Sequence, residues 1–135
     1  MVCYDESDLS KHVVKEAQKH AQVWNAELVI VRAVMREDPI KHSKLLEMEN
    51  QLESEIKKLF EKVDIPYNVQ LEGDDIDVEQ RIIKLVEREK VDLVFLGPKK
   101  RSKVGKLLFG STAQYIILHS PCPVVTITRL AKDWN

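Results

Sequence analysis

The sequence predicts a doubly wound α/β domain, in which a five-stranded parallel sheet carries helices on both faces. Three observations support this prediction. Short runs of β-branched residues alternate along the chain with longer segments whose apolar residues recur at helical spacing. Such alternation favours parallel strands, because each helix returns the chain to the same end of the sheet. The 135 residues contain no internal repeat and no linker-like segment, so we expect one domain over residues 1–135.

The first strand and the first helix are expected directly at the start of the chain. Residues 1–4, "MVCY", form an apolar run that suits a short strand. Residues 5–8 form its exit loop, in which Ser7 or Asp8 caps the following helix. Over residues 9–24 the apolar residues at helical spacing predict a buried stripe of Val13, Val14, Ala17, Ala21 and Trp24.

The second strand and the second helix follow the same pattern. Residues 27–34 are rich in valine and isoleucine and predict a strand. Asp38 and Pro39 predict a helix start, because a capping side chain is followed by proline in the first turn. We expect this helix to end before Pro66. Its apolar stripe is predicted to contain Leu45, Met48, Leu52, Ile56, Leu59 and Val63.

A third strand is expected over residues 67–72, where Gly73 breaks it. The third helix is expected over residues 78–90, opened by a capping box in which Asp77 precedes Gln80 by three residues.

The last part of the chain predicts a buried strand, a short helix and a final strand. Residues 91–97 are almost all apolar, which is typical of a strand that is buried on both faces. A helix is expected over residues 111–118, with His119 at its end, where a cation favours the helix dipole. Residues 122–128 are β-branched and predict the final strand.

Composition and charge exclude several classes of function. The formal net charge is −1, so the chain as a whole does not attract nucleic acid, and nucleic-acid binding is not expected. No apolar run approaches the roughly 18 residues of a transmembrane helix, and no signal-peptide pattern opens the chain. Cys3 and Cys122 are too few for a disulfide framework or a zinc site. We therefore expect a cytoplasmic protein with reduced thiols and no membrane partner.

Two loops are candidate functional sites. In a doubly wound sheet, ligands bind outside the carboxyl ends of the strands, at the point where the strand order reverses. The loop after the first strand carries the polar residues Asp5, Glu6 and Ser7. The segment after the fourth strand, residues 97–112, contains three glycines and five cations. Its length is typical of a functional loop.

These two loops resemble the universal stress protein family of the UspA type. The family pattern has Asp-x-Ser after the first strand, G-x2-G-x9-G-[S/T] after the fourth, and a Pro-Cys-Pro-Val element near the end. This chain has Asp5-Glu6-Ser7, then Gly97, Gly110 and Ser111 at the family's spacing, then residues 121–124, "PCPV". The match covers the chain from end to end.

The resemblance implies the strand order 3-2-1-4-5, a homodimer, and a regulatory nucleotide bound between the first and fourth strands. The nucleotide would be ATP or AMP, with or without Mg²⁺. The resemblance places Asp5 near the adenosine and Ala33 or Val34 against the base. Its expected phosphate contacts are Gly97, Lys100, Gly110, Ser111 and Thr112. From the residues themselves we expect no catalytic residues and no resident metal site.

Two residues depart from the family's phosphate loop. Lys100 occupies the position of the second glycine, and Pro98 follows the first. Proline has no amide N–H to donate, and a Cβ at residue 100 hinders the approach of backbone amides to phosphate. The segment from Gly110 to Thr112 still opens a helix, whose N-terminus attracts anions. The loop's cations can also contact phosphate through charge-assisted hydrogen bonds.

We therefore predict a stress-response protein that binds an adenine nucleotide and is not an enzyme. The alternative is a nucleotide-free dimeric interaction module of the same fold, whose basic loop docks an acidic partner. A slow ATPase or self-phosphorylating enzyme ranks last, because only Asp5 and Glu6 lie near the site as a base or metal ligand. His12, Glu16 and His20 share one helical face, and we interpret them as a solvated flank of the helix rather than a metal site.

The final strand predicts how two copies associate. In the implied order it lies at an edge of the sheet, and residues Val124 to Thr128 contain no charge and no proline. Natural edges of this kind are usually covered. Antiparallel pairing with the same strand of a second copy would cover it with two-fold symmetry. The alternative is that residues 129–135 fold back over the edge.

Overall fold

The computed structural model describes residues 1–35, 42–74, 76–98 and 110–128. The predicted helix start at Asp38 and Pro39 lies outside these residues, as do Lys100 and the rest of the basic loop from 99 to 109. The elements follow in the order β1 (Val2–Cys3), α1 (Asp8–Trp24), β2 (Leu28–Met35), α2 (His42–Phe60), β3 (Tyr67–Asp74), α3 (Val78–Arg88), β4 (Val94–Leu96), α4 (Ser111–His119) and β5 (Val124–Thr126).

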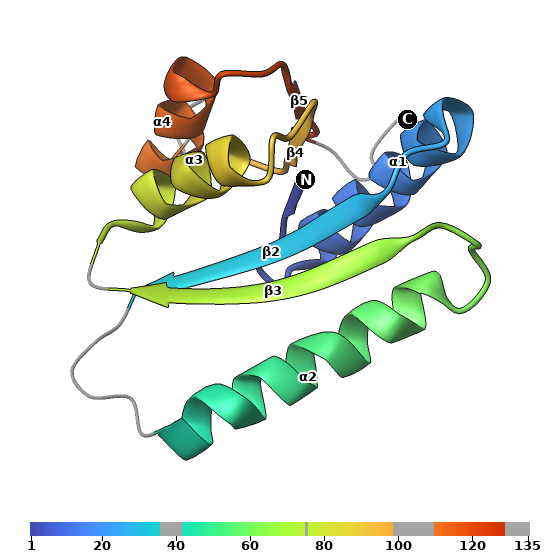
Figure 1. Cartoon of the computed structure of the whole chain (residues 1–135), viewed down its shortest axis with the longest axis horizontal. Coiled ribbons are helices and arrows are strands. Elements are labelled where there is room, and N and C mark those ends of the chain that lie inside the picture. Colours follow the sequence, from blue (N-terminus) through green and yellow to red (C-terminus); the bar gives the residue numbers. More distant parts are fainter. Residues whose placement is uncertain (36–41, 75, 99–109, 129–135) are drawn as a thin grey trace.

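The five strands form one parallel sheet in the order β3-β2-β1-β4-β5 (Figure 1). The central strand β1 is short, and its Val2 lies opposite Ile30 of β2 and Phe95 of β4. Strands β2 and β3 pair over their full lengths, and β5 adds to β4 with Val125 opposite Phe95. The predicted fold class and the strand order implied by the family resemblance are confirmed.

Two helices cover each face of the sheet, so the hydrophobic core has two halves. Helices α1 and α2 pack on one face, and α3 and α4 pack on the other, which is the upper face in Figure 1. Val13 and Val14 of α1 meet Leu52 and Ile56 of α2 in the first half, and all four are fully buried. In the second half, the buried side chains of the helices are Ile82, Leu85, Val86, Ala113 and Ile116.

The helix faces agree with the predicted stripes except near their ends. Val13, Val14, Ala17 and Ala21 are buried as predicted, but the prediction for Trp24 is wrong, since Trp24 is 76% exposed. It is the last residue of α1, and the left-handed cap at Asn25 follows it. In α2, Leu52 and Ile56 are buried, whereas Leu45 and Met48 are half-buried.

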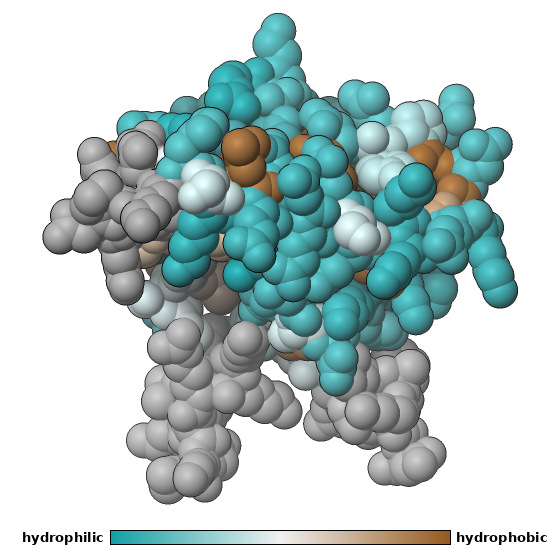
Figure 2. Space-filling view, turned by 90° about the horizontal axis from the view of Figure 1, so that it is seen from below, coloured by the Kyte–Doolittle hydropathy of each residue, from teal (hydrophilic) through white to brown (hydrophobic). Residues whose placement is uncertain are grey.

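The outer surface on the α2 side is hydrophilic. Figure 2 views the molecule from below, the side on which α2 lies in Figure 1, and shows mostly polar side chains with few and separated apolar ones. Leu46 is one of the exposed apolar residues of α2. Among the described residues, no helix is long and apolar enough to cross a bilayer.

Two local predictions about α3 and β3 are wrong. Gly73 does not break the third strand, because it pairs with Val34 inside β3, which continues to Asp74. Asp77 is the N-cap of α3, but its side chain makes no capping hydrogen bond. In contrast, the prediction of a cap at Ser7 or Asp8 is confirmed at Ser7, since the Ser7 side chain accepts a hydrogen bond from the backbone N–H of Ser10.

Candidate functional site

A pocket opens at the carboxyl ends of the central strands, where the fold places ligands in doubly wound sheets. It encloses about 230 Å³ on the side of α3 and α4. The walls come from the ends of β1, β2 and β4, and from the facing ends of α1, α3 and α4. They include Cys3, Tyr4, Asp5, Ser10, Val31, Ala33, Val78, Ile82, Leu96, Gly97, Pro98, Gly110, Thr112, Ala113 and Ile116.

The turn after β1 is held by hydrogen bonds among its own polar side chains. The carboxylate of Asp5 accepts hydrogen bonds from the backbone N–H of Ser7, at 3.0 Å, and from the Ser7 hydroxyl. The Ser10 hydroxyl donates to the carbonyl oxygen of Ser7 at 2.9 Å, and the backbone N–H of Ser10 donates to the Ser7 hydroxyl at 3.1 Å. Asp5 is therefore exposed at the pocket but held in one orientation.

Glu6 has a role that the sequence did not indicate. Its φ angle is +68°, in the left-handed region that non-glycine residues rarely adopt. Its carboxylate forms an ion pair with the Arg32 guanidinium at the end of β2. The ion pair offsets the negative charge of Glu6 and supports the strained backbone of the turn. No spacing in the sequence indicates this pairing.

Gly97 is required by packing rather than by its backbone angle. A Cβ at this position would lie 2.9 Å from Cγ2 of Val13 and 3.0 Å from Cγ of Leu9, both in α1. These separations are shorter than van der Waals contact. Gly97 therefore allows α1 to lie directly over the end of β4, and this close approach shapes one wall of the pocket.

The N-terminus of α4 forms another wall of the pocket. Gly110 is its N-cap and has no side-chain cap, and the first turn carries no acidic residue. Thr112 and Ala113 line the pocket, whereas Ser111 does not and is exposed. The Thr112 hydroxyl donates to the carboxylate of Glu79 in α3, at 3.5 Å. This half-buried carboxylate, which sequence reasoning missed, lies next to the helix end that attracts anions.

Strand alternation distinguishes the two residues predicted to contact the base. Val31 and Ala33 point to the α3 and α4 face, together with the pocket, while Ile30 points to α1 and α2. Val34 follows Ile30 by four residues, and side chains alternate with a period of two. Val34 therefore lies on the same face of the sheet as Ile30, which is the face away from the pocket. Only Ala33 of the pair lines the pocket.

The structure brings most of the predicted site residues together. Five of them line the pocket, namely Asp5, Ala33, Gly97, Gly110 and Thr112, whereas Val34 and Ser111 do not. Lys100 lies outside the described residues.

Two groups beside the pocket, the Cys3 thiol and the Tyr4 hydroxyl, have shifted pKa values. Burial raises the pKa of the Cys3 thiol to about 12, so this thiol stays protonated at neutral pH. Burial, followed by the hydrogen bond that its hydroxyl donates to Glu55 in α2 at 3.1 Å, raises the pKa of Tyr4. The end of β1 is therefore linked to α2 through Tyr4.

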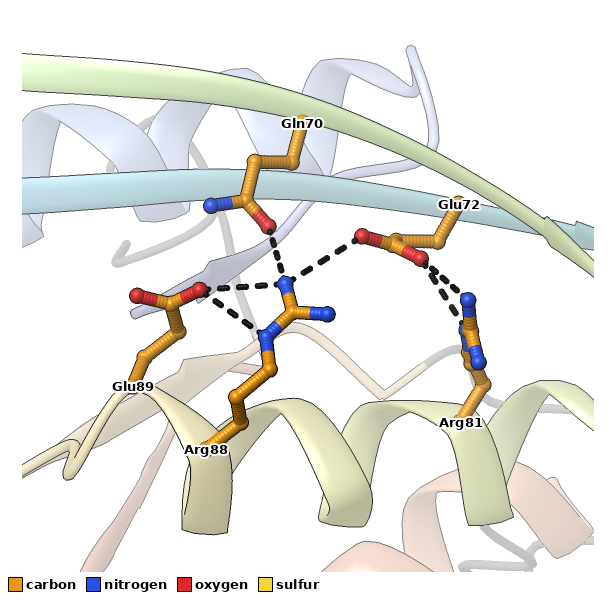
Figure 3. A network of polar contacts seen from close by, with 5 residues as sticks. All are labelled: Gln70, Glu72, Arg81, Arg88 and Glu89. Carbon is orange, nitrogen blue, oxygen red and sulfur yellow. Dashed lines mark hydrogen bonds and ion pairs between the residues drawn. The ribbon is translucent and has the colours of Figure 1, made fainter.

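A separate polar network lies away from the pocket, between α3 and β3 (Figure 3). Arg81 donates to one oxygen of Glu72 at 2.8 and 3.0 Å, and Arg88 lies 3.6 Å from the other oxygen. Arg88 also contacts Gln70 and Glu89. The positive charges of this network are paired with its negative charges, so the network serves as a structural link between α3 and the sheet.

His20 of α1 has structural contacts as well. The ring of His20 packs edge-on against Phe95, with 5.1 Å between centroids, and its Nδ1 lies 2.9 Å from the carbonyl oxygen of Glu16. The Glu16 side chain pairs with Lys19. Among the described residues, no three His, Cys, Asp or Glu side chains are grouped so that they could hold a metal ion.

Comparisons with known proteins agree with this architecture. Residues 1–128 match the model of the universal stress protein (Usp) family. The "universal stress protein in QAH/OAS sulfhydrylase 3′region" of Thermus aquaticus is 27% identical over 139 residues, covering 94% of this chain and 96% of the relative.

Solved structures show the same fold. A universal stress protein from Archaeoglobus fulgidus has a TM-score of 0.80 at 24% identity, with 94% of this chain and 96% of that chain covered. A second structure from that organism, in complex with dAMP, has a TM-score of 0.75 at 20% identity and covers 94% of both chains. The family model spans all nine elements described above. The chain therefore belongs to the universal stress protein family.

Proposed function

We propose that this protein binds an adenine nucleotide, ATP or AMP, as a regulatory ligand in the pocket between the ends of β1 and β4. One observation carries the proposal. Residues expected to contact the nucleotide come from four separate parts of the chain and line one pocket: Asp5, Ala33, Gly97, Gly110 and Thr112. The structure of a relative of the same fold is a complex with dAMP, which supports this choice of ligand.

The two ends of the pocket differ in chemistry, as the two ends of a nucleotide do. Val31, Ala33 and Ile82 form an apolar wall suited to a base. The N-terminus of α4 carries backbone N–H groups that have no partner within the helix, and it is the positive end of the helix dipole, so it favours phosphate. The volume of 230 Å³ is below the roughly 300–1,000 Å³ of typical ligand pockets. We infer that the described walls enclose the nucleoside and that the phosphates extend beyond them.

Glu79 opposes phosphate binding in this arrangement. The Glu79 carboxylate accepts a hydrogen bond from the Thr112 hydroxyl. A bound phosphate would compete with this carboxylate for the hydroxyl, and the negative charge of Glu79 would repel the phosphate. We expect Glu79→Gln to strengthen nucleotide binding about two- to fivefold, which corresponds to a change of less than 1 kcal/mol. This direction is specific to an anionic ligand, since an uncharged ligand would not respond in this way.

The experiment is a calorimetric titration of AMP, and of ATP with Mg²⁺, into the full chain and into two matched variants. Ala33→Leu fills the apolar wall of the pocket, and we expect it to weaken binding at least about tenfold. Val34→Leu enlarges the neighbouring side chain on the opposite face of the sheet, and we expect affinity within about twofold of the parent. Equal losses in both variants, or none in either, would contradict the assignment of the base to this wall.

Lys100→Gly decides between the nucleotide-binding protein and the interaction module. If the parent binds and this variant binds more weakly, Lys100 contacts the phosphates. If only the variant binds, Lys100 closes the site, and a nucleotide-free module that docks an acidic partner becomes the better proposal. A nucleotide acts as a regulator to the extent that it binds two conformations with different affinity. A change in amide hydrogen exchange on α1 or α4 upon binding would support that role.

We also propose that two copies of the chain pair through β5. The strand is at the edge of the sheet, and it spans Val124–Thr126, which is shorter than the predicted strand over residues 122–128 and than the predicted pairing segment Val124 to Thr128. The N–H of Ile127 donates to the carbonyl oxygen of Leu96 at 2.9 Å. By alternation, the N–H of Thr126 points away from β4, toward a second copy.

Thr126→Pro tests this pairing. The substitution removes the outward N–H without removing a hydrogen bond to β4, and Thr126→Val is the matched control that keeps the N–H. We expect sedimentation equilibrium to show a dimer for the parent and for Thr126→Val, and a monomer for Thr126→Pro. A parent that is monomeric at tens of micromolar would refute the dimer.

A further inference from the structure

The turn after β1 contains an ion pair that joins two of the strands at the pocket. Glu6 directly follows Asp5, and Arg32 lies in β2 between Val31 and Ala33. The Glu6 carboxylate accepts a hydrogen bond from the Arg32 guanidinium, across 26 positions of the chain. The two side chains are 30% and 22% exposed, so water and salt screen the pair only in part. The pair links the turn that carries Asp5 to the strand that carries the apolar wall.

This ion pair lies on the face of the sheet away from the pocket. Side chains alternate along β2, and Val31 and Ala33 line the pocket, so Arg32 points to the half of the core formed by α1 and α2. Tyr4 is buried in that same half. Burial is the main cause of the raised pKa of Tyr4, and the nearby negative charge of Glu6 adds to it. Neither Glu6 nor Arg32 lines the pocket, so the pair can influence a ligand only through other residues.

Glu6 has a backbone conformation that needs such support. Among the described residues, a positive φ occurs at three residues other than glycine, namely Glu6, Asn25 and Lys90. Asn25 and Lys90 follow the last turns of α1 and α3, where a left-handed residue commonly ends a helix. Glu6 instead precedes α1, and its Cβ disfavours the φ of +68°. The ion pair opposes this strain, because a relaxed backbone would move the Glu6 carboxylate away from Arg32.

The same backbone conformation orients the Asp5 carboxylate. This carboxylate accepts a hydrogen bond from the N–H of Ser7, two residues further on, at 3.0 Å, as in an Asx turn. The peptide bond that carries this N–H directly follows Glu6, so a change of the Glu6 dihedral angles would turn the N–H away from Asp5. Asp5 is exposed and lines the pocket. The ion pair therefore controls the direction in which a carboxylate of the pocket points.

We propose that Glu6 and Arg32 are positioning residues for the nucleotide, which hold the Asp5 carboxylate in the orientation that accepts hydrogen bonds from the ribose hydroxyls. The inference rests on the proposed function, since it requires an adenine nucleotide whose adenosine lies near Asp5. Ribose hydroxyls are hydrogen-bond donors, and a carboxylate that is held in place before binding loses little freedom when it accepts them. The pair acts from the opposite face of the sheet, without touching the ligand.

The test compares Glu6→Ala with Glu6→Gly in a calorimetric titration of AMP into the full chain. Both variants lose the carboxylate and the ion pair, and they differ in how readily position 6 adopts a positive φ. We expect Glu6→Ala to bind AMP at least about threefold more weakly than Glu6→Gly. Arg32→Met is expected to weaken binding in the parent chain, and Arg32→Lys, which keeps the charge, to recover most of that loss. In the Glu6→Gly background, we expect Arg32→Met to change the affinity by less than about twofold.

A second ligand separates an effect on Asp5 from a general effect on the pocket. The compound 2′,3′-dideoxy-AMP keeps the base and the phosphate but lacks both ribose hydroxyls. We expect Glu6→Ala and Glu6→Gly to bind it within about twofold of each other. A difference as large as that for AMP would overturn the proposal, because the pair would then act on the pocket as a whole. Equal affinities of the two Glu6 variants for AMP would also overturn it.

Amide hydrogen exchange of the ligand-free chains keeps this test distinct from that of the proposed function. After correction for intrinsic rates, we expect the Ser7 N–H to be at least about threefold less protected in Glu6→Ala than in Glu6→Gly. A parent chain that binds no AMP would refute the proposed function, and the positioning role with it. A parent chain that binds AMP, with equal protection of Ser7 in the two variants, would refute the positioning role alone.

Discussion

The substitution Gly97→Ala tests the close approach of α1 to β4 that shapes the pocket at the ends of β1 and β4. The added Cβ would lie 2.9 Å from Cγ2 of Val13, a fully buried β-branched side chain that has little freedom to move. Leu9 lies at 3.0 and 3.2 Å on the other side. Overpacking of this kind costs about 1–3 kcal/mol. For a chain of this length, we expect the midpoint of thermal unfolding to fall by roughly 4 to 12 °C.

Gly73→Ala is the matched control for this prediction. A Cβ at Gly73 would lie 3.5 Å from Cγ2 of Val34, an ordinary van der Waals contact, and Gly73 is exposed. Loss of glycine also reduces the entropy of the unfolded chain, so we expect a change between zero and a gain of about 1 kcal/mol. Equal effects at both positions in urea-unfolding experiments would show that loss of glycine, and not steric contact, decides the outcome.

A double-mutant cycle locates the clash. Val13→Ala alone creates a small cavity and destabilises the protein, but in the Gly97→Ala background it removes the methyl group that the new Cβ meets. We expect the double variant to be more stable than the sum of the single effects predicts, by about 0.5–3 kcal/mol. Additive single effects would refute the reasoning that Gly97 is needed for the approach of Val13.

Three further predictions follow from the turn after β1 and from the buried groups near it. Ser7→Ala removes the N-cap of α1 and is expected to cost about 0.5–2 kcal/mol in urea unfolding, while Ser7→Asp, which can still cap, costs less. Burial lowers the pKa of the Met1 ammonium in the folded protein from its usual 8.0. Between the folded-state and the unfolded-state pKa, the unfolded state therefore binds more protons than the folded state. The free energy of unfolding is thus expected to rise with pH in that window, up to about pH 8. Acetylation of the amine removes this rise, and a slope that persists after acetylation would assign it to another group. Burial raises the pKa of Cys3 to about 12. The variant Cys122→Ser leaves Cys3 as the only thiol of the chain. At pH 8 we expect this thiol to react with a disulfide reagent more than about tenfold more slowly in the folded protein than in denaturant.

Much of the fold was predictable because periodicity reports directly on burial. The apolar spacing in α1 predicted Val13, Val14, Ala17 and Ala21 correctly, since each contacts the sheet along the body of the helix. The same spacing failed at Trp24. A periodic pattern indicates which face of a helix is apolar, but it does not show where the helix extends past the sheet that covers that face.

Part of the candidate site was predictable from motif spacing, and part was not. Asp5, Gly97, Gly110 and Thr112 follow from the family pattern and do line one pocket. The contacts of Glu6 with Arg32 and of Thr112 with Glu79 join residues 26 and 33 positions apart, and no local pattern reports such pairs. Long-range ion pairs and hydrogen bonds depend on the register of the strands.

The sequence by itself determined the class of fold, the order of its elements, a cap for α1 at Ser7 or Asp8, and membership of the universal stress protein family, because these depend on local spacing. Only the tertiary structure decided that Ala33 and not Val34 faces the pocket, since alternation separates two faces but does not say which helices cover each. It also decided that Gly97 serves the packing of α1. These features depend on the distances between elements that are far apart in the chain, which no local pattern encodes.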